Sequence, residues 1–165
     1  MYIFRASILL GALNLLALAL SSPTDLTPSG ALATMEFNRA DNAINSPDAP
    51  KSNGNYAHVI KHGNVLHLSG WMGQDLEGNV VKGGAVAQTE QAVRNIEACL
   101  KAAGSSLDKI ISRRIFITDM SQVFEVDAAW GRLLNAPYPV STAIGVTTLT
   151  QKEAVVELEV QAALD

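Results

Sequence analysis

The sequence predicts an α+β domain in which two helices cover one face of a single mixed β-sheet. Three observations support this fold class. Two stretches, 85–104 and 123–134, carry apolar residues at helical spacing. β-rich runs flank both stretches, which gives the order β-β-α-β-α-β-β. The last run alternates apolar and polar residues, as a strand with one buried face does. Its apolar set is Val156, Leu158, Val160 and Ala162.

The first strands are expected to form a hairpin. Two β-rich runs lie on either side of a tight turn at His62-Gly63-Asn64, and Gly63 supplies the backbone freedom that such turns need. A second turn is expected at 77–79, which reads Glu-Gly-Asn. We therefore expect the folded domain to begin near Gly54 and to span 54–165.

The two helices have clear sequence boundaries. Gly104 is placed to end the first helix, because glycine adopts the left-handed backbone that follows a helix. Asp119 or Ser121 is placed to cap the second. The second helix carries one apolar stripe, which predicts a buried face. That stripe is Val123, Val126, Trp130, Leu133 and Leu134.

Three further strands are expected over 107–119, 140–148 and 154–162. The two alternating sets of the final strand cannot both face the helices, so something else must cover the second face of the sheet. The sequence predicts oligomerisation, with the face that carries Val156, Leu158 and Val160 buried between subunits.

The N-terminal segment 1–22 has the pattern of a secretory signal peptide. Arg5 precedes an apolar run over 8–20 that is too short to span a membrane, and small residues and Pro23 follow. We expect secretion or entry into a secretory-pathway lumen, with no membrane contact after the leader is removed. The alternative is an apolar N-terminal anchor or docking helix, in a cytoplasmic or membrane-anchored protein.

Residues 23–53 are rich in Ser, Pro, Asn and Asp, which predicts a linker or N-terminal extension with one short strand around 34–37. Cys99 is the single cysteine, so the chain has no internal disulfide. Cys99 lies near the apolar stripe of the first helix, and we expect it to be a buried small hydrophobe. His58 and His62 are placed to share a strand face without a third ligand, so no metal site is predicted.

Charge argues against a nucleic-acid partner. The chain has 12 Lys and Arg against 16 Asp and Glu, a net charge of -4, and no clustered basic stripe. Binding to a phosphate backbone needs such a stripe. A role in RNA cleavage has no support from this composition.

From Gly54 to Leu164 the chain resembles the RidA/YjgF-like family, the reactive intermediate deaminases. The resemblance is carried by GNYAHVIKHGNVLHLSG, QTEQAVRNIEACLKAAG, FITDMSQVFEVDAAW, the YP before the penultimate strand, and VVELEVQAAL. It implies a chorismate-mutase-like fold, a homotrimer whose sheets form a central barrel, and small-molecule clefts between subunits. It also implies no metal and no organic cofactor. The family's typical activity is hydrolysis of a 2-imino or enamino acid to the 2-keto acid.

The chain departs from the family at the residue that binds the substrate carboxylate. In the family, an arginine in a Pro-x-Arg-Ser motif is the bidentate partner of that carboxylate. Here the motif reads Pro139-Val140-Ser141-Thr142, so Ser141 stands at the arginine position. Ala143 replaces a residue that is commonly cysteine, and Gly145 follows on the same face. We interpret this strand face as emptied, which predicts a wider and more neutral cavity.

Other family positions are kept. The resemblance implies that Tyr56 is the cleft tyrosine, that the Gly70 backbone N–H faces the ligand, and that Glu157 positions the attacking water. Asp127 replaces a family asparagine, and Trp71 is placed to line the cleft. By pattern alone, Glu157 also fits a solvated strand residue and Trp71 fits core packing. We assign catalysis to Glu157 and Tyr56. The predicted substrate-binding residues are Gly70, Trp71, Asp127, Ser141 and Ala143.

Three functions remain open. The first is an enzyme acting on a neutral or bulky carbonyl, imine or enamine by water addition, dehydration or proton transfer. The second is a 2-imino or enamino acid deaminase with a substitute carboxylate anchor, such as a backbone N–H or a neighbouring Arg. The third is a non-catalytic ligand-binding or chaperone-like trimer.

Overall fold

The computed structural model describes residues 37–164, which belong to one compact unit. The expected signal peptide at 1–22 lies outside the described residues, and so does most of the strand expected at 34–37. Within the described chain, no helix is long and apolar enough to span a bilayer.

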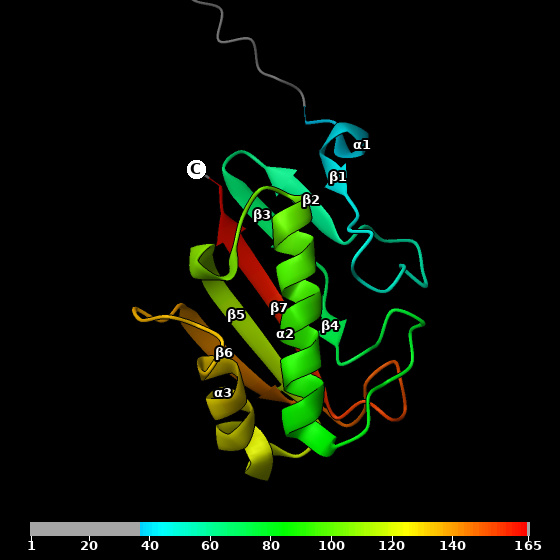
Figure 1. Ribbon diagram of the computed structural model, residues 1–165, viewed down its shortest axis with the longest axis vertical. Coiled ribbons are helices and arrows are strands. Elements are labelled where there is room, and N and C mark those ends of the chain that lie inside the picture. Colours follow the sequence, from blue (N-terminus) through cyan, green and yellow to red (C-terminus); the bar gives the residue numbers. More distant parts are fainter. Residues whose placement is uncertain (1–36, 165) are drawn as a thin grey trace, which may run out of the picture. The chain divides into compact units, whose positions relative to one another are not determined.

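The described residues form a mixed seven-stranded sheet, shown in Figure 1. The strands are β1 (Ala43–Ile44), β2 (Val59–His62), β3 (Val65–Leu68), β4 (Trp71–Met72), β5 (Ile110–Ile117), β6 (Val140–Gly145) and β7 (Val156–Ala163). They run in the order β1-β2-β3-β7-β5-β6, and β4 also pairs with β7. β5 and β6 are parallel, whereas the other pairs are antiparallel. The predicted mixed sheet is confirmed, with β6 as one edge strand.

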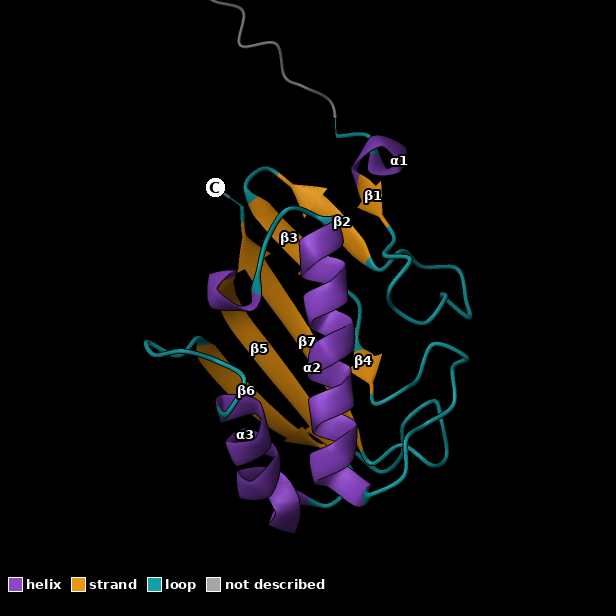
Figure 2. Ribbon diagram, in the orientation of Figure 1, coloured by secondary structure: helices purple, strands orange, loops and turns teal. Residues whose placement is uncertain are grey.

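Both long helices lie on the same face of this sheet, as predicted (Figure 2). They are α2 (Gly84–Ala102) and α3 (Val123–Gly131), and the short α1 (Arg39–Asn42) precedes β1. Asp119 accepts a 2.9 Å hydrogen bond from the Ser121 backbone N–H. It therefore caps the 3₁₀ helix η2 (Met120–Gln122), and α3 begins directly after that turn.

The C-terminal end of α2 follows the sequence prediction. Gly104 has a φ of 78°, and the Ser105 N–H donates to the Leu100 carbonyl at 2.8 Å. These two features satisfy the last turn of the helix. Cys99 is fully buried, and burial raises the pKa of its thiol to about 12. Its expected role as a buried small hydrophobe is confirmed.

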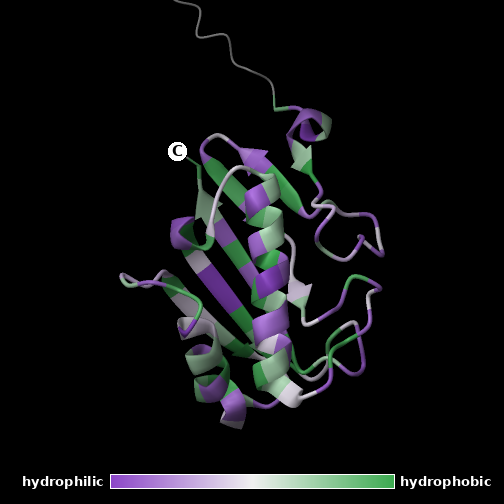
Figure 3. Cartoon of the chain, viewed as in Figure 1, coloured by the Kyte–Doolittle hydropathy of each residue, from purple (hydrophilic) through white to green (hydrophobic). Residues whose placement is uncertain are grey.

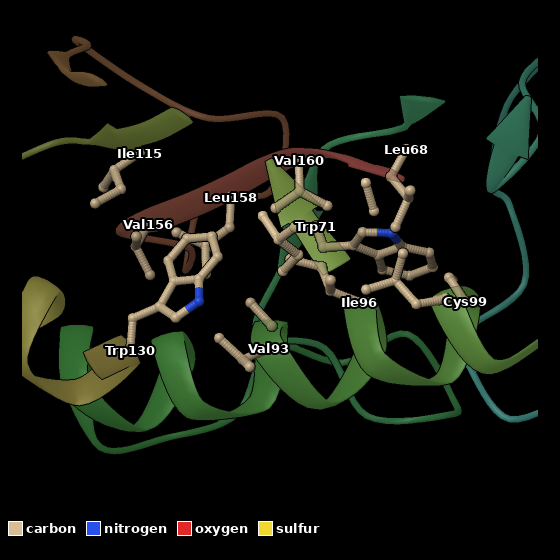
Figure 4. Close-up of a cluster of buried hydrophobic side chains, with 14 of the residues drawn as sticks. Leu68, Trp71, Val93, Ile96, Cys99, Ile115, Trp130, Val156, Leu158 and Val160 are labelled. Atoms are coloured by element: carbon tan, nitrogen blue, oxygen red, sulfur yellow. The ribbon is translucent and has the colours of Figure 1, made fainter. Parts of the chain in front are cut away.

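The apolar side of β7 is the core of the domain. Val156, Leu158 and Val160 are buried beneath the helices, and Figure 4 shows them facing α2 and the indole of Trp130. Burying an aliphatic side chain of this size stabilises a fold by about 1.5–3 kcal/mol. The prediction that these three residues form a face between subunits is therefore wrong, because the helices of the same chain already cover them.

The opposite side of β7 is the uncovered one. Glu157, Glu159 and Gln161 point to it and are only half-buried. Figure 3 shows the resulting alternation of hydrophobic and hydrophilic bands along the strands. If a second copy of the chain covers the sheet, it covers this more polar face.

The folded unit begins before Gly54, the boundary expected from the sequence. β1 pairs with β2 in the register Ala43↔Ile60. Downstream of β1, the Ser46 backbone N–H donates to Nδ1 of the buried His58 at 3.1 Å. Ala49 is also buried. Residues 43–50 therefore pack against the sheet, although the polar composition of 23–53 predicts a linker.

Candidate functional site

The predicted site residues fall into two groups that lie apart in the single chain. We call Tyr56, Gly70 and Glu157 the glutamate half-site, and Asp127, Ser141 and Ala143 with their neighbours the arginine half-site. Glu157 is on β7, and β5 separates β7 from β6, which carries Ser141. Ser141 and Glu157 also face opposite sides of the sheet. Ser141 pairs with Arg113, and Arg113 pairs with Val160, so all three residues share the face that the helices cover. Glu157 lies on the other face of β7.

In the glutamate half-site, the Glu157 carboxylate packs closely against Gly70. Gly70 lies between β3 and β4, and a β-carbon on it would sit 1.9 Å from Glu157 Oε1. No side chain fits there while the carboxylate keeps its place. The absence of a side chain at Gly70 therefore leaves the space that the Glu157 carboxylate occupies.

The protonation of Glu157 is shifted by its surroundings. Burial raises the pKa of this carboxyl above its ordinary value, and the negative charge of Glu159 raises it further. A carboxyl that holds its proton more tightly is better matched to proton transfer near neutral pH. This shift distinguishes Glu157 from an ordinary solvated strand glutamate.

A cavity of about 360 Å³ adjoins this half-site. Tyr56 lines it and is 48% exposed, and its hydroxyl donates to Asn53 Oδ1 at 2.8 Å. Leu76 and Gln151 come from two separate loops to complete the wall. The cavity therefore has one phenol and Gly70 on its wall, close to the Glu157 carboxylate.

Trp71 belongs to this wall but packs chiefly in the core. It is 4% exposed, and its indole meets the His58 ring edge-to-face with 5.0 Å between centroids. Figure 4 shows the indole lying over Ile96 and Cys99. The packing interpretation of Trp71 therefore accounts for most of its surface.

Arg113 organises the arginine half-site. It lies on β5, and its side chain is only 9% exposed. Nε donates to Ser141 Oγ at 3.0 Å, and Nη2 pairs with the Asp127 carboxylate. The guanidinium stacks over Trp130, 4.9 Å from the ring centroid. Nη1 is buried with no hydrogen-bond partner among the described residues.

This arrangement corrects the interpretation of β6 as an emptied face. The space beside Ser141 is taken by Arg113, which comes from the neighbouring strand. Gly145 is also explained by packing, because a β-carbon there would lie 2.9 Å from Met120 Cγ. Ala143 remains exposed on the edge strand. The half-site is neutral overall, since one guanidinium faces one carboxylate.

Sequence reasoning did not identify Arg113, although a signal was present. In the run SRRIFIT, Arg113 alternates with Ile115 and Ile117, which places a charged residue on the apolar face of the strand. Charged residues at such positions are rare unless they are paired. Asp127 is that partner.

The two histidines considered for metal binding serve other contacts. His58 accepts from Ser46, and the ring of His62 packs edge-to-face on Phe37 at 5.1 Å. Over residues 37–164, no group of three or more His, Cys, Asp or Glu side chains is arranged to hold a metal ion.

Comparison with known proteins identifies the family. The family model described as Endoribonuclease L-PSP matches residues 46–164. The chain belongs to the RidA/YjgF-like family. Among solved structures of this family, RidA from an Antarctic Psychrobacter is similar with a TM-score of 0.70 and 32% identity, over 74% of this chain and 98% of that one. The expected RidA/YjgF-like fold is confirmed.

Curated relatives of the RidA/YjgF-like family cover a similar span. A RutC family protein of Pyrococcus horikoshii is 33% identical over 117 residues, which are 70% of this chain and 92% of the relative. A protein of Dermatophagoides farinae, named 2-iminobutanoate/2-iminopropanoate deaminase, is 28% identical over 70% of this chain and 91% of its own length. The name of this one relative thus gives it a deaminase activity on two 2-imino acids.

Proposed function

We propose that this chain is a RidA-family enzyme whose intersubunit cleft acts on a neutral or bulky carbonyl, imine or enamine substrate, by water addition, dehydration or proton transfer. One observation carries the proposal. The guanidinium of Arg113, beside the position where the resemblance implies a carboxylate-binding arginine, is already paired with Asp127. An anionic substrate meets no net positive charge there.

A homotrimer is part of this proposal. The glutamate half-site and the arginine half-site lie apart within one chain, so a complete cleft needs two copies of it. The half-buried polar face of β7 and the edge strand β6 remain uncovered in the single chain. Contact between subunits through these surfaces supplies the cover that the sheet lacks.

Glu157 is the group that we propose to move protons. As a carboxylate, it takes a proton from water as the oxygen attacks the C=N carbon of the protonated imine; an enamine reaches this form when its β-carbon takes up a proton. Glu157 then returns its proton to the amine nitrogen, and NH3 departs as the new O–H group loses its proton to water and becomes the C=O, so that the enzyme ends as it began. Its raised pKa and its fixed position over Gly70 both suit this cycle. Tyr56 is half-exposed at the cavity wall, where its hydroxyl can accept from the substrate while it donates to Asn53.

A second candidate is hydrolysis of 2-imino or enamino acids with Arg113 as the substitute anchor. The observation that favours it is Nη1 of Arg113, which has no partner among the described residues. This function requires a substrate carboxylate to compete with Asp127. A non-catalytic ligand-binding trimer would keep the same cleft without turnover.

The family description names endoribonucleases, but the charges of this chain do not suit RNA. Two of its exposed arginines are in ion pairs, Arg114 with Glu159 at 2.6 Å and Arg132 with Glu90 at 2.8 Å. Cations that are already paired release fewer counterions on meeting a phosphate backbone. We therefore do not propose nucleic-acid binding.

The leader at 1–22 supports a location in the secretory pathway. We propose that it is a cleaved signal peptide, on the pattern of Arg5, the apolar run and the small residues before Pro23. N-terminal sequencing of protein exported by its own cells tests this. A start at residue 1 would exclude cleavage.

The functional test compares neutral and acidic imines. An amine oxidase generates neutral imines in situ, and an amino-acid oxidase generates 2-imino acids; ammonia release is followed with and without the protein. We expect faster release from neutral imines, and loss of this acceleration in Glu157→Gln. Faster hydrolysis of imino acids would favour the second candidate. Equal rates with and without the protein, for every substrate, would favour the non-catalytic one.

A further inference from the structure

We propose that Asp127 is the specificity-determining residue of the cleft. Its carboxylate occupies Arg113 as an internal anion and thereby excludes anionic ligands. Loss of that single negative charge converts the same place into a carboxylate-binding site. This inference rests on the proposed function, since it assigns the specificity of the cleft proposed there.

The exposed fractions of the Arg113 and Asp127 side chains indicate which of the two lies between the other and the solvent. The Arg113 side chain is 9% exposed and the Asp127 side chain is 54% exposed. The guanidinium is therefore enclosed by protein, and Asp127 lies on its solvent side. A ligand that approaches Arg113 has to take the place of the Asp127 carboxylate.

Arg113 does not depend on Asp127 for its position. Its aliphatic stem leaves β5, its Nε is fixed by Ser141, and its plane rests on the Trp130 ring. Both contacts therefore persist when the Asp127 charge is removed. A guanidinium fixed in this way is preorganised, and it loses little rotamer freedom when it binds an anion.

The released donors match a carboxylate. Nη1 is already buried without a hydrogen-bond partner among residues 37–164. With asparagine at residue 127, Nη2 beside Nη1 keeps at most a neutral hydrogen bond, which is weaker than the charge-assisted one that a carboxylate offers. Two adjacent N–H groups of one guanidinium are the bidentate partner of a carboxylate. An enclosed guanidinium without a counter-charge is unfavourable, so an anion that enters is bound tightly.

In the unmodified chain, an external carboxylate has to compete with a tethered one. A group held on the same chain acts at an effective concentration of about millimolar or more. Asp127 therefore suppresses carboxylate binding without removing the cation.

The neighbouring residue provides a matched control. Arg114 follows Arg113 on β5 but points to the opposite face, where it pairs with Glu159 at 2.6 Å. Its side chain is 50% exposed, so water solvates it when the partner charge is lost. Glu159→Gln thus frees an arginine on the same strand that is neither enclosed nor stacked on an aromatic ring.

The experiment is calorimetric titration of the purified full chain with 2-oxobutanoate and with acetate. We expect Asp127→Asn to bind 2-oxobutanoate at least about tenfold more tightly than the unmodified protein. The gain disappears in the double variant Asp127→Asn with Arg113→Gln, and Glu159→Gln behaves like the unmodified protein. Equal binding by Asp127→Asn and the unmodified protein overturns the inference. So does a gain that survives the loss of Arg113.

Thermal unfolding covers the case in which Asp127→Asn folds poorly. We then expect 2-oxobutanoate to raise its unfolding midpoint, because a ligand that binds only the folded state stabilises that state. No rise in the variant contradicts the inference. The outcome is separate from the proposed function, because turnover of neutral imines by the unmodified protein is measured independently. Failure of the titration with turnover intact removes only the role of Asp127.

Discussion

The carboxylate of Glu157 rests on the α-carbon of Gly70, so that a β-carbon at residue 70 would overlap Oε1 at 1.9 Å. Catalytic groups tolerate little displacement, and a shift of about 1 Å can reduce a rate about a hundredfold. We therefore expect Gly70→Ala to reduce imine hydrolysis by about two orders of magnitude with little change in secondary structure, as judged by circular dichroism. Gly131→Ala is the control, because nothing lies within 4 Å of a β-carbon there. Full activity in Gly70→Ala would show that the Glu157 position is unimportant.

Glu157 also makes a prediction about stability. Its folded-state pKa is raised, first by burial and then by Glu159, so the protonated form is the one that the fold favours. This contribution is present below the ordinary value of 4.5 and is lost as pH rises through the folded-state pKa. At pH 7, Glu157→Gln should therefore unfold a few degrees higher than the unmodified protein, on the order expected for about 1 kcal/mol. The difference should shrink as the pH approaches 4.

The exposed Glu153 provides the comparison for this effect, because Glu153→Gln removes a carboxylate from a solvated loop. Its unfolding midpoint should follow that of the unmodified protein at both pH values. A lower midpoint for Glu157→Gln at pH 7 would mean that the ionised carboxylate stabilises the fold, contrary to the sign given above.

His58 should make the N-terminal segment sensitive to acid. Burial lowers the pKa of its ring, and a hydrogen bond with the Pro50 backbone opposes this in part. The neutral ring is favoured, so its contribution to stability is present above the ordinary value of 6.5 and is lost as pH falls through the folded-state pKa. Protonated Nδ1 can no longer accept from the Ser46 N–H. We expect the unfolding midpoint to fall between pH 7 and pH 5, and less so in His58→Gln. His62→Gln, at an exposed position of β2, should keep the full pH dependence.

Ser141→Arg tests the arginine half-site from the other strand. Because Arg113 Nε lies 3.0 Å from Ser141 Oγ, the new guanidinium would share Asp127 with Arg113 and leave one positive charge in excess. We expect tighter binding of 2-oxobutanoate, worth about 1.5–3 kcal/mol for a charge-assisted hydrogen bond, together with lower stability from the like charges. Titration and urea unfolding measure the two effects. Unchanged binding by a folded variant would place residue 141 outside the ligand-binding cleft.

Oligomerisation should depend on the β6 edge. Val140 is 71% exposed there, and an exposed apolar side chain on an edge strand favours burial in an interface. We expect light scattering to show a trimer for the unmodified protein and a smaller species for Val140→Asp. Phe124, on the helix layer, is 83% exposed, and Phe124→Asp should leave the trimer intact. A monomer at micromolar concentration without any substitution would remove the intersubunit cleft.

Sequence patterns predicted the order of elements well, because their periods are strong. The stripe ending at Trp130 and the alternation of Val156 and Leu158 both reflect burial on one side, and periodicity reports burial directly. Periodicity does not say what covers the buried side. Periodicity alone is therefore equally consistent with a partner subunit over the apolar face of β7, whereas α2 and α3 of the same chain cover it (Figure 4).

The N-terminal packing and the arginine half-site were harder to predict. Residues 43–50 pack through one short strand and single polar contacts such as Ser46 with His58, which leave no period in the sequence. Arg113 and Ser141 are 28 residues apart in the sequence, and the parallel pairing of their strands brings them into contact. The residue pattern of one strand does not predict a side-chain contact that comes from the neighbouring strand.

The register between β5 and β6 has a consequence for how such clefts diverge. Residues 113 and 141 are opposite each other, about 4.7–4.9 Å apart in the hydrogen-bonding direction. Two point substitutions can therefore exchange an arginine on the edge strand β6 for one on the adjacent strand β5, with no insertion and no change of backbone. The arginine on β5 is more buried, and a single neighbouring carboxylate decides whether it is available to a ligand. Diversification of ligand choice in this fold can proceed by exchanging residues across a strand pair while the loops stay unchanged.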